Sequence, residues 1–439
     1  MPHPHALGAE ALLAPRLEQR ILPGLDRVRH ALDALGHPER TFASILVVGT
    51  NGKGSTAALL AGILQSHGVR VGLYTSPHLV AVEERIRVGG AMVSRPRLAE
   101  LVAALERFPD LSYFETLTCA AALEFAERRV AVAVMEAGLG GRWDASSAAE
   151  PAVALLTNVG TDHRKWLGDT RTAIAAEKAA ALRGLEAIVG AWDTEVEPVI
   201  RAGAAAGTPL SLASDWASVR PLFEGSHVQR FEGSGPGTSE RSNLRTFERN
   251  PVEFTVAGVS GEAGLPLAGA HQVANLRLAL AAAAALAKHG IGPAPEAAAV
   301  TRAIEGVSWP GRMQWCQVRG RTLLVDGAHN AEAMEALAAA LDSMRLPRPP
   351  HLLFSCLDDK PLDEMVALLR PRVDGVTVAP IASPRATPLA ELAEAFPGCT
   401  RAASVAAALL AIPEDRPTLV TGSLRLAGEV LAIGGYGLG

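Results

Sequence analysis

Short apolar runs alternate along this chain with longer segments of helical periodicity, and polar clusters follow many of the runs. A short run of β-branched and aliphatic residues bounded by turn signals indicates a buried strand, whereas apolar residues three or four apart indicate a helix. We expect strands at 45–48, 69–74, 130–135 and 153–157, with helices at 25–35, from the glycine-rich turn to residue 67, at 113–128 and at 172–183. Strands that alternate with helices predict an α/β fold with a parallel sheet.

The same alternation starts again in the last third of the chain. Strand, helix and strand within 185–212 extend the first sheet, and a helix of almost pure alanine and leucine follows the polar cluster 267–275. Proline and glycine at 309–311 then break any regular element. We therefore expect a first domain, 1–307, and a smaller, Rossmann-like α/β domain, 308–439, with strands at 322–325, 351–354, 376–378 and 418–421.

Residues 213 to 262 differ from the rest of the chain. Their strands are poorly defined, and a Gly/Ser/charge tract at 232–242 predicts a flexible excursion. We assign this segment no chemistry, and its role stays open.

Composition limits the classes of function. The 439 residues suffice for two or three domains, and a hydrophobic fraction of 49% is ample for their cores. The net charge of −5 gives no general attraction for nucleic acid or anionic lipid, so neither is expected as a partner. The four cysteines form no CxxC pair, and there is no signal-peptide pattern and no uncharged apolar run of about 18 residues. We expect a cytoplasmic monomer that is not bound to membranes.

A glycine-rich turn follows the first predicted strand, with the sequence Gly49-Thr50-Asn51-Gly52-Lys53-Gly54-Ser55-Thr56. Glycine permits positive φ and close approach, so successive N–H groups and a helix N-terminus can converge on an anion. Lys53 can neutralise phosphates, and the hydroxyl of Ser55 or Thr56 can meet Mg²⁺. The spacing departs from the general P-loop, because two residues instead of four separate Gly49 from Gly52 and because Gly54 follows the lysine. A tight βα connection is the alternative.

Polar residues also follow three other predicted strands. Ser76, Pro77 and His78 end the second strand, Glu136 ends the third, and His163 lies beyond the fourth. Open α/β sheets bind ligands at the carboxyl edge of their strands, so we expect these side chains to meet the phosphate loop at one rim. Burying a carboxylate without a partner is costly, which implies a metal or a basic group near Glu136. A helix cap or an exposed loop carboxylate is the alternative.

Lys178 lies on the apolar stripe of the helix predicted at 172–183, together with Ile174 and Leu182. A side chain that extends outward to solvent is the ordinary explanation for such a lysine. A functional lysine is the alternative.

Motifs along nearly the whole chain resemble those of the Mur ligase superfamily, in the branch that contains folylpolyglutamate synthase and dihydrofolate synthase. They are GTNGKGST at 49–56, TSPHL at 75–79 with ERI at 84–86, EAGLGGR at 136–142, NVGTDH at 158–163, EKA at 177–179, GAHQVAN at 269–275 and DGAHN at 326–330. The match departs from the family at Gly89 or Gly90, Trp143, Ser146-Ser147 and Ala180, and it is missing mainly across 213–262.

The resemblance implies roles for particular residues. ATP would lie between the two domains, on Thr50, Asn51, Gly52, Lys53, Gly54, Ser55, Thr56, Asn275, Arg312, Asp326 and His329. The catalytic residues would be Lys53, His163, Lys178 and Arg312, and the substrate-binding residues Ser76, Pro77, His78, Arg85 and Arg142. Two Mg²⁺ ions would be held by Ser55, Ser76, Glu136, His163 and Lys178, the lysine as a carbamate.

The resemblance also implies an activity, the ATP-dependent ligation of L-glutamate through an acyl phosphate. The acceptor would be dihydropteroate, the γ-carboxylate of (tetrahydro)folate, or both, and the sequence leaves this choice and the glutamate chain length open. One alternative is a Mur-type ligase that joins amino acids to a cell-wall nucleotide, against which Gly54-Ser55 and TSPHL…ERI argue. The other is a nucleotide-binding module without catalysis, against which the retention of Glu136, His163 and Lys178 argues.

Overall fold

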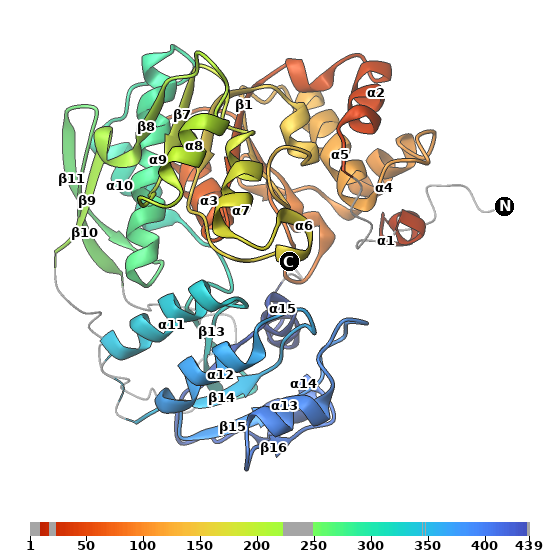
Figure 1. The fold of residues 1–439 in the computed structure, drawn as a ribbon, viewed down its shortest axis with the longest axis vertical. Coiled ribbons are helices and arrows are strands. Elements are labelled where there is room, and N and C mark those ends of the chain that lie inside the picture. The colour runs from red at the N-terminus through yellow and green to blue at the C-terminus, as the bar shows by residue number, and fades with distance from the viewer. Residues whose placement is uncertain (1–8, 17–22, 223–248, 345, 347, 437–439) are drawn as a thin grey trace, which may run out of the picture.

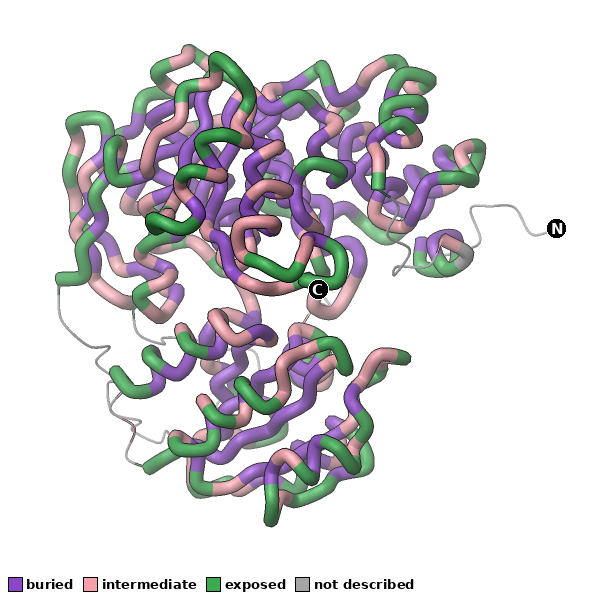
Figure 2. Tube along the Cα trace, in the orientation of Figure 1, coloured by how far each residue is buried: buried purple, intermediate pink, exposed green. Residues whose placement is uncertain are grey.

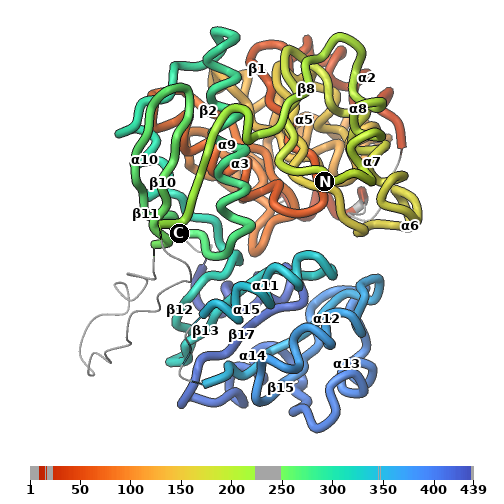
Figure 3. Tube along the Cα trace, turned by 60° about the vertical axis from the view of Figure 1, so that its left-hand side comes forward, coloured from red at the N-terminus to blue at the C-terminus, as the bar shows by residue number. Residues whose placement is uncertain are grey.

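The computed structural model describes residues 9–16, 23–222, 249–344, 346 and 348–436. Two α/β units lie one above the other, the larger formed by the first part of the chain and the smaller by the last (Figure 1). A view turned by 60° shows the same separation (Figure 3). The strands of the second unit begin at Gln314, and a domain boundary between residues 307 and 308 stays a prediction.

The first unit is built on an eight-stranded sheet. Its strands are β1 Ala43–Val48, β2 Val71–Tyr74, β3 Ile86–Val88, β4 Ala91–Met92, β5 Val132–Glu136, β6 Pro151–Leu156, β7 Glu186–Val189 and β8 Leu210–Leu212. Their order in the sheet is β4-β3-β2-β5-β1-β6-β7-β8. The strands β2, β5, β1, β6, β7 and β8 are parallel to one another. The strands β3 and β4 are antiparallel to their neighbours. Because β1 lies between β5 and β6, the turn after it has a strand end on each side.

Successive residues of β1 enter two different cores, because side chains of a strand point alternately to opposite faces. Leu46 and Val48 pack on one face, and Ile45 and Val47 on the other. All four are fully buried, which explains the uninterrupted apolar run. The first face is covered by α1 Ala9–Leu13, α2 Asp26–Ala34, α4 Arg95–Ala104, α5 Tyr113–Glu127, α7 Arg171–Ala179 and α8 Glu197–Gly203, and the second by α3 Lys53–Ser66, α9 Ala270–Lys288 and α10 Ala297–Gly306.

The predicted parallel strands and helices of this unit are confirmed, with differences mainly at their ends. The helix predicted to reach residue 183 stops at Ala179, and β3 and β4 were not predicted. A short helix, α6 Arg164–Leu167, also lies at the carboxyl edge of the sheet.

The prediction of poorly defined strands across 213–262 was wrong. Three antiparallel strands form a separate sheet here, β9 Ala217–Pro221, β10 Asn250–Val256 and β11 Val259–Leu265. Val252, Phe254 and Val256 alternate with less buried residues and pack in the same core as α9. The pairing of β9 with β10 spans a long insertion, which hides it from a local pattern search. The tract 232–242 lies outside the described residues.

The second unit contains a six-stranded sheet, and its smaller α/β architecture is confirmed (Figure 1). The strands are β12 Gln314–Val318, β13 Arg321–Val325, β14 His351–Phe354, β15 Gly375–Val378, β16 Thr400–Arg401 and β17 Thr418–Thr421, in the order β12-β13-β17-β14-β15-β16. One face packs on α11 Ala331–Ser343, α12 Leu362–Leu369 and α13 Leu389–Ala395, the other on α14 Val405–Ala411 and α15 Leu424–Ile433. Figure 2 shows the central strands of both units as buried and the outer turns as exposed. The edge strands β12 and β16 were not predicted.

Candidate active site

A cleft of about 1560 Å³ lies between the two units, at the carboxyl ends of the parallel strands of the first. The phosphate loop, the segments after β2, β5 and β6, and the start of α11 contribute to its walls. Four side chains expected at one rim, those of Ser55, Ser76, Glu136 and His163, all line this cleft. The sheet topology therefore brings them together as the sequence predicted.

Close packing explains two glycines of the phosphate loop. Gly52 precedes α3 with φ +82°, and a Cβ there would lie 2.3 Å from Oδ1 of Asn275. A Cβ at Gly49 would lie 1.8 Å from Oγ1 of Thr157. Neither position can carry a larger residue in this arrangement, and Asn275 packs directly on the loop.

Hydrogen bonds anchor the phosphate loop to the segment after β6. The N–H of Asn51 donates to Oδ1 of Asn158 at 3.0 Å, and the hydroxyl of Thr157 donates to the carbonyl of Asn51 at 2.6 Å. The N–H of Gly160 donates to Oγ1 of Thr50 at 2.8 Å. These three hydrogen bonds hold Thr50 and Asn51 against the segment after β6.

Two lysines donate to the same loop carbonyl. Nζ of Lys53 lies 3.0 Å from the carbonyl oxygens of Gly49 and Thr50, and Nζ of Lys178 lies 2.8 Å from that of Gly49. Lys178 is only 3% exposed, so the ordinary explanation of a side chain extending to solvent was wrong. Burial, and then the charge of Lys53, lowers the pKa of Lys178 to about 7. Burial also lowers the pKa of Lys53, against the attraction of Glu136.

Glu136 is buried at the end of β5. Its Oε2 accepts the N–H of Ser76 at 3.0 Å, and burial raises its pKa while Lys53 and this hydrogen bond lower it. A Cβ at Gly54 would lie 3.3 Å from that Oε2 and 3.1 Å from Nε1 of Trp309. The glycine after the lysine, unusual for a P-loop, therefore leaves room for the carboxylate and for the linker tryptophan. Ser55 and Thr56 are buried beside it.

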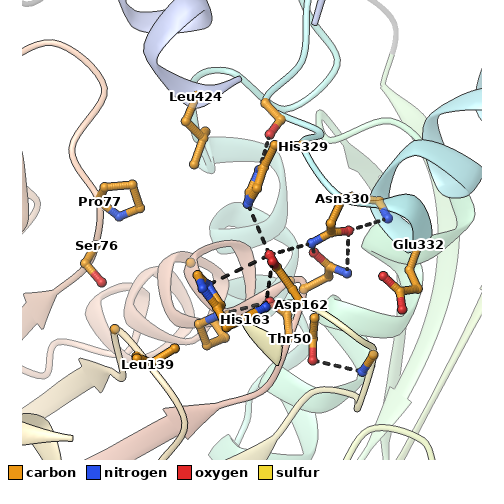
Figure 4. A pocket seen from close by; sticks show the side chains of 18 of the residues that line it. Thr50, Ser76, Pro77, Leu139, Asp162, His163, His329, Asn330, Glu332 and Leu424 are labelled. Carbon is orange, nitrogen blue, oxygen red and sulfur yellow. Dashed lines mark hydrogen bonds and ion pairs between the residues drawn. The ribbon is translucent and has the colours of Figure 1, made fainter. Parts of the chain in front are cut away.

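The loop after β2 carries the expected substrate-binding residues. Ser76, Pro77, His78 and Arg85 line the cleft, and Nε of Arg85 donates to Nδ1 of His78 at 3.0 Å. The Arg85 guanidinium also lies 5.2 Å from the ring centre of Tyr113. Figure 4 shows Ser76 and Pro77 on one side of the pocket and the second unit's side chains on the other.

Three predicted site residues, Thr56, Arg142 and Lys178, are not among those that line the cleft. Arg142 is held by another residue. Its Nε donates to Oε1 of Glu177 at 3.0 Å, and its backbone N–H donates to the Glu177 carbonyl. A role at the substrate stays a prediction, and it would need this side chain to rotate.

His163 stands at the N-terminus of α6 with φ +62°. The cleft walls partly desolvate its ring, which keeps 41% of its exposure, and lower its pKa to about 4, although Asp162 opposes the shift. The imidazole is therefore neutral at pH 7. Burial alone would raise the pKa of Asp162, but His163, Lys360 and His329 together hold it well below its usual range.

The second unit contributes the motif at 326–330 and the linker arginine. Asp326 accepts the N–H groups of Met313 and Ala328, both at 2.8 Å, so it shapes the linker as well as lining the cleft. Nδ1 of His329 lies 2.7 Å from the carbonyl of Gly327, and NH1 of Arg312 donates to that of Gly311. The predicted nucleotide contacts of these residues stay predictions.

Asp162, Asn330, Glu332 and Lys360 are among the cleft residues to which the sequence assigned no role. Asp162 and Asn330 stand inside motifs, and attention to their polar neighbours could have found them. Glu332 and Lys360 gave no signal, because each belongs to an ordinary charged stretch. Glu332 and Lys360 contact Thr161 and Asp162 of the first unit, and only the folded structure shows these contacts.

No three His, Cys, Asp or Glu side chains converge as a preformed metal centre in the ranges that the structure describes. The predicted donors nevertheless fit a hard cation that is held partly by phosphates. Glu136 supplies a buried carboxylate, Ser55 and Ser76 supply hydroxyls, and His163 supplies a neutral imidazole. Mg²⁺ commonly binds through one or two carboxylates together with water and substrate phosphates.

The fold and cleft define a class of protein, a two-domain α/β enzyme whose phosphate loop faces a second α/β unit. The Mur ligase middle domain matches residues 47–283, and the Mur ligase glutamate ligase domain matches residues 311–429. The chain is 31% identical to the dihydrofolate synthase/folylpolyglutamate synthase of Bacillus subtilis, covering 88% of each. It therefore belongs to the Mur ligase family, in the branch of the folylpolyglutamate and dihydrofolate synthases.

Other relatives agree with this assignment. A probable bifunctional folylpolyglutamate synthase/dihydropteroate synthase of Haloferax volcanii is 33% identical over 93% of this chain, which spans only 48% of that longer protein. The solved structure of E. coli FolC with DHPP and ADP superposes with a TM-score of 0.81 at 27% identity, covering 99% of both chains. A Yersinia pestis folylpolyglutamate synthase/dihydrofolate synthase with AMPPNP and Mn superposes at 0.78, with 27% identity and coverage of 98% and 99%.

None of the helices in the described ranges is both long enough and apolar enough to cross a membrane.

Proposed function

We propose that this protein ligates L-glutamate to dihydropteroate, to the γ-carboxylate of (tetrahydro)folate, or to both, using ATP. The observation that carries the proposal is the single cleft that joins the phosphate loop, Glu136 and the loop at 75–79 to the motif 326–330. The branch of the Mur ligase family to which the chain belongs supports the choice of substrates.

The chemistry needs a good leaving group on a carboxylate. An oxygen of the acceptor carboxylate attacks the γ-phosphorus of ATP, ADP leaves, and an acyl phosphate forms. The glutamate amine then attacks the acyl carbon, inorganic phosphate leaves, and the nitrogen loses a proton. Phosphoryl transfer depends mainly on positioning and on neutralising charge, the roles we assign to Lys53 and Arg312, which both line the cleft.

A divalent cation belongs to this proposal, because the Yersinia pestis structure is complexed with AMPPNP and a Mn ion. Ser55, Ser76, Glu136 and His163 would hold it, and such an ion supplies charge neutralisation for the phosphates. We further propose that Lys178 carries a carbamate. Its depressed pKa provides the neutral amine that adds to CO₂, and the two carbamate oxygens suit a hard cation.

We also propose a cytoplasmic monomer that binds neither nucleic acid nor membranes. The free thiols of Cys119, Cys316, Cys356 and Cys399 suit a reducing compartment. The net charge of −5 gives no general attraction for nucleic acid or anionic lipid.

The test is phosphate release from ATP in the presence of L-glutamate, with dihydropteroate or tetrahydrofolate as acceptor. We expect release that requires both glutamate and one of these acceptors. Release with a cell-wall nucleotide instead would assign the chain to the other Mur-type activity. ATP binding without release under any of these conditions would leave a nucleotide-binding module.

A further inference from the structure

Two side chains of the second unit reach across the cleft to consecutive residues of the first. Glu332 contacts Thr161, and Lys360 contacts Asp162. We call these two contacts the latch. Thr161 and Asp162 directly precede His163, so the latch ends next to a predicted catalytic residue.

The Glu332 contact is short and has two parts. Its Oε1 accepts both the backbone N–H and the hydroxyl of Thr161, each at 2.7 Å. A Cβ at Gly160 would lie 2.9 Å from the Glu332 carboxylate, so the glycine is what permits this approach. Glu332 lies in the first turn of α11, where the helix dipole favours a carboxylate. Figure 4 shows Glu332 and Asn330 side by side next to this edge of the first unit.

The Lys360 contact is an ion pair shielded from solvent. Nζ lies 2.8 Å from Oδ1 of Asp162, and the two side chains are 5% and 11% exposed. Surface ion pairs contribute little because water and salt screen them, but a desolvated, hydrogen-bonded pair fixes a geometry firmly. Nδ2 of Asn330 donates to the other Asp162 oxygen at 3.1 Å.

The latch is continuous with the phosphate loop. Nδ2 of Asn330 also lies 3.0 Å from Oδ1 of Asn51, and Nδ2 of Asn51 lies 3.3 Å from Oδ1 of Asn330. The N-terminal turn of α11 is thus tied to the ATP side of the cleft, while Lys360 is tied to the segment that carries His163.

We propose that Glu332 and Lys360 are positioning residues, which hold the second unit against Thr161 and Asp162 in the arrangement that ligation requires. This inference rests on the proposed function for its kinetic consequence. Its structural consequence, a fixed distance between the units, can be measured without turnover.

The experiment compares the wild-type chain with Lys360→Met, Lys360→Arg and Glu332→Ala. The matched control is Lys288→Met, which removes a 2.9 Å ion pair with the buried Glu186 inside the first unit. Small-angle X-ray scattering with AMPPNP and Mg²⁺ reports the separation of the units. Thermal unfolding shows whether each variant folds, and kcat and KM for ATP are measured separately.

We expect Lys360→Met and Glu332→Ala to have a larger radius of gyration than the wild type with AMPPNP. Misplacement of catalytic groups should lower their kcat roughly 10-fold to 100-fold, with less change in KM. Lys360→Arg should recover part of the wild-type compactness and part of the wild-type kcat. Lys288→Met should change neither the radius of gyration nor kcat. Folded Lys360→Met and Glu332→Ala proteins with wild-type scattering would overturn the proposal. If the wild type has no ligase activity but the scattering differs as expected, the proposed function fails and the latch stands.

Discussion

The side-chain nitrogens of Lys53 and Lys178 both lie within hydrogen-bond distance of the carbonyl of Gly49, and substitution of each lysine leads to a different prediction. Lys53 lines the cleft and donates to the carbonyls of Gly49 and Thr50, whereas Lys178 is buried on α7 outside the cleft lining. Substitution of Lys53 should therefore test contact with the phosphates, and substitution of Lys178 should test the proposed carbamate.

Lys53→Ala should lower turnover at least about 100-fold, because the phosphates lose a charge that acts in the transition state. The fold should remain, since the side chain contributes two hydrogen bonds worth about 1 kcal/mol each. Steady-state phosphate release and thermal unfolding of the purified variant provide the test. Wild-type turnover in this variant would remove the phosphate-loop interpretation.

Lys178→Ala and Lys178→Arg should be equally inactive if the carbamate is required. Arginine keeps the positive charge of a simple ion pair but does not form a carbamate, and a small added carboxylate should partly restore the alanine variant. A carbamate carbon signal from ¹³CO₂ in the wild type, absent from both variants, would provide a readout independent of activity. Normal turnover by Lys178→Arg would contradict the carbamate.

At the scale of elements, helix α15 packs against the loop that carries Ser76. A Cβ at Gly428 would lie 2.0 Å from the carbonyl oxygen of Leu79. The contact is between backbone and helix surface, so no side chain can rotate away to relieve it. The second unit thereby supports the loop that carries the predicted substrate-binding residues Ser76, Pro77 and His78.

Gly428→Ala should raise KM for the pteroate substrate and destabilise the protein by about 1 to 3 kcal/mol, as overpacking does. Gly306→Ala is the matched control, because a Cβ there would meet nothing within 4 Å. Kinetics with varied pteroate and thermal unfolding of both variants distinguish the two sites. An unchanged KM for Gly428→Ala would show that α15 does not position the loop.

His351 links strand β14 to the pH dependence of stability. It is buried, its Nε2 lies 2.8 Å from Oγ1 of Thr377, and burial lowers its pKa, although Asp374 opposes the shift. The unfolded state therefore binds the proton more readily, so stability that is present above a pH of about 6.5 is lost as the pH falls.

His351→Gln should make unfolding less sensitive to pH between about 7 and 5, because glutamine keeps a polar contact to Thr377 but does not titrate. Urea unfolding at several pH values gives the free energies. Parallel curves for the wild type and the variant would exclude His351 as the source of acid sensitivity.

At the scale of the whole molecule, the insertion between β9 and β10 joins two strand ends that are already paired. Pro221 pairs with Val252, and the N–H of Leu222 donates to the carbonyl of Pro251 at 2.9 Å. The entropic cost of closing such a loop changes little with its length, because it varies only with the logarithm of the number of residues.

Deleting residues 233 to 242 should therefore change stability by less than about 1 kcal/mol and leave turnover unchanged. Unfolding and phosphate release of the deletion variant are the measurements. Loss of pteroate binding in a folded deletion variant would reveal a substrate-binding role for the tract.

Short-range patterns in the chain were enough to predict the parallel sheet and the polar residues at the ends of its strands. The apolar run at β1, the glycines of the phosphate loop and the polar strand ends at Ser76 and Glu136 predicted the parallel sheet and its rim, because strand period and strand direction fix where such residues lie. The helical period likewise placed Lys178 on the apolar stripe of its predicted helix.

Contacts between segments that are distant in the chain could not be predicted and are seen in the folded protein alone. The sheet of β9, β10 and β11 depends on pairing across an insertion, and the position of Arg142 depends on Glu177 from another element. The latch joins Asp162 to Lys360, far apart in the chain. No local periodicity encodes such contacts, because they arise from the packing of one complete unit against another.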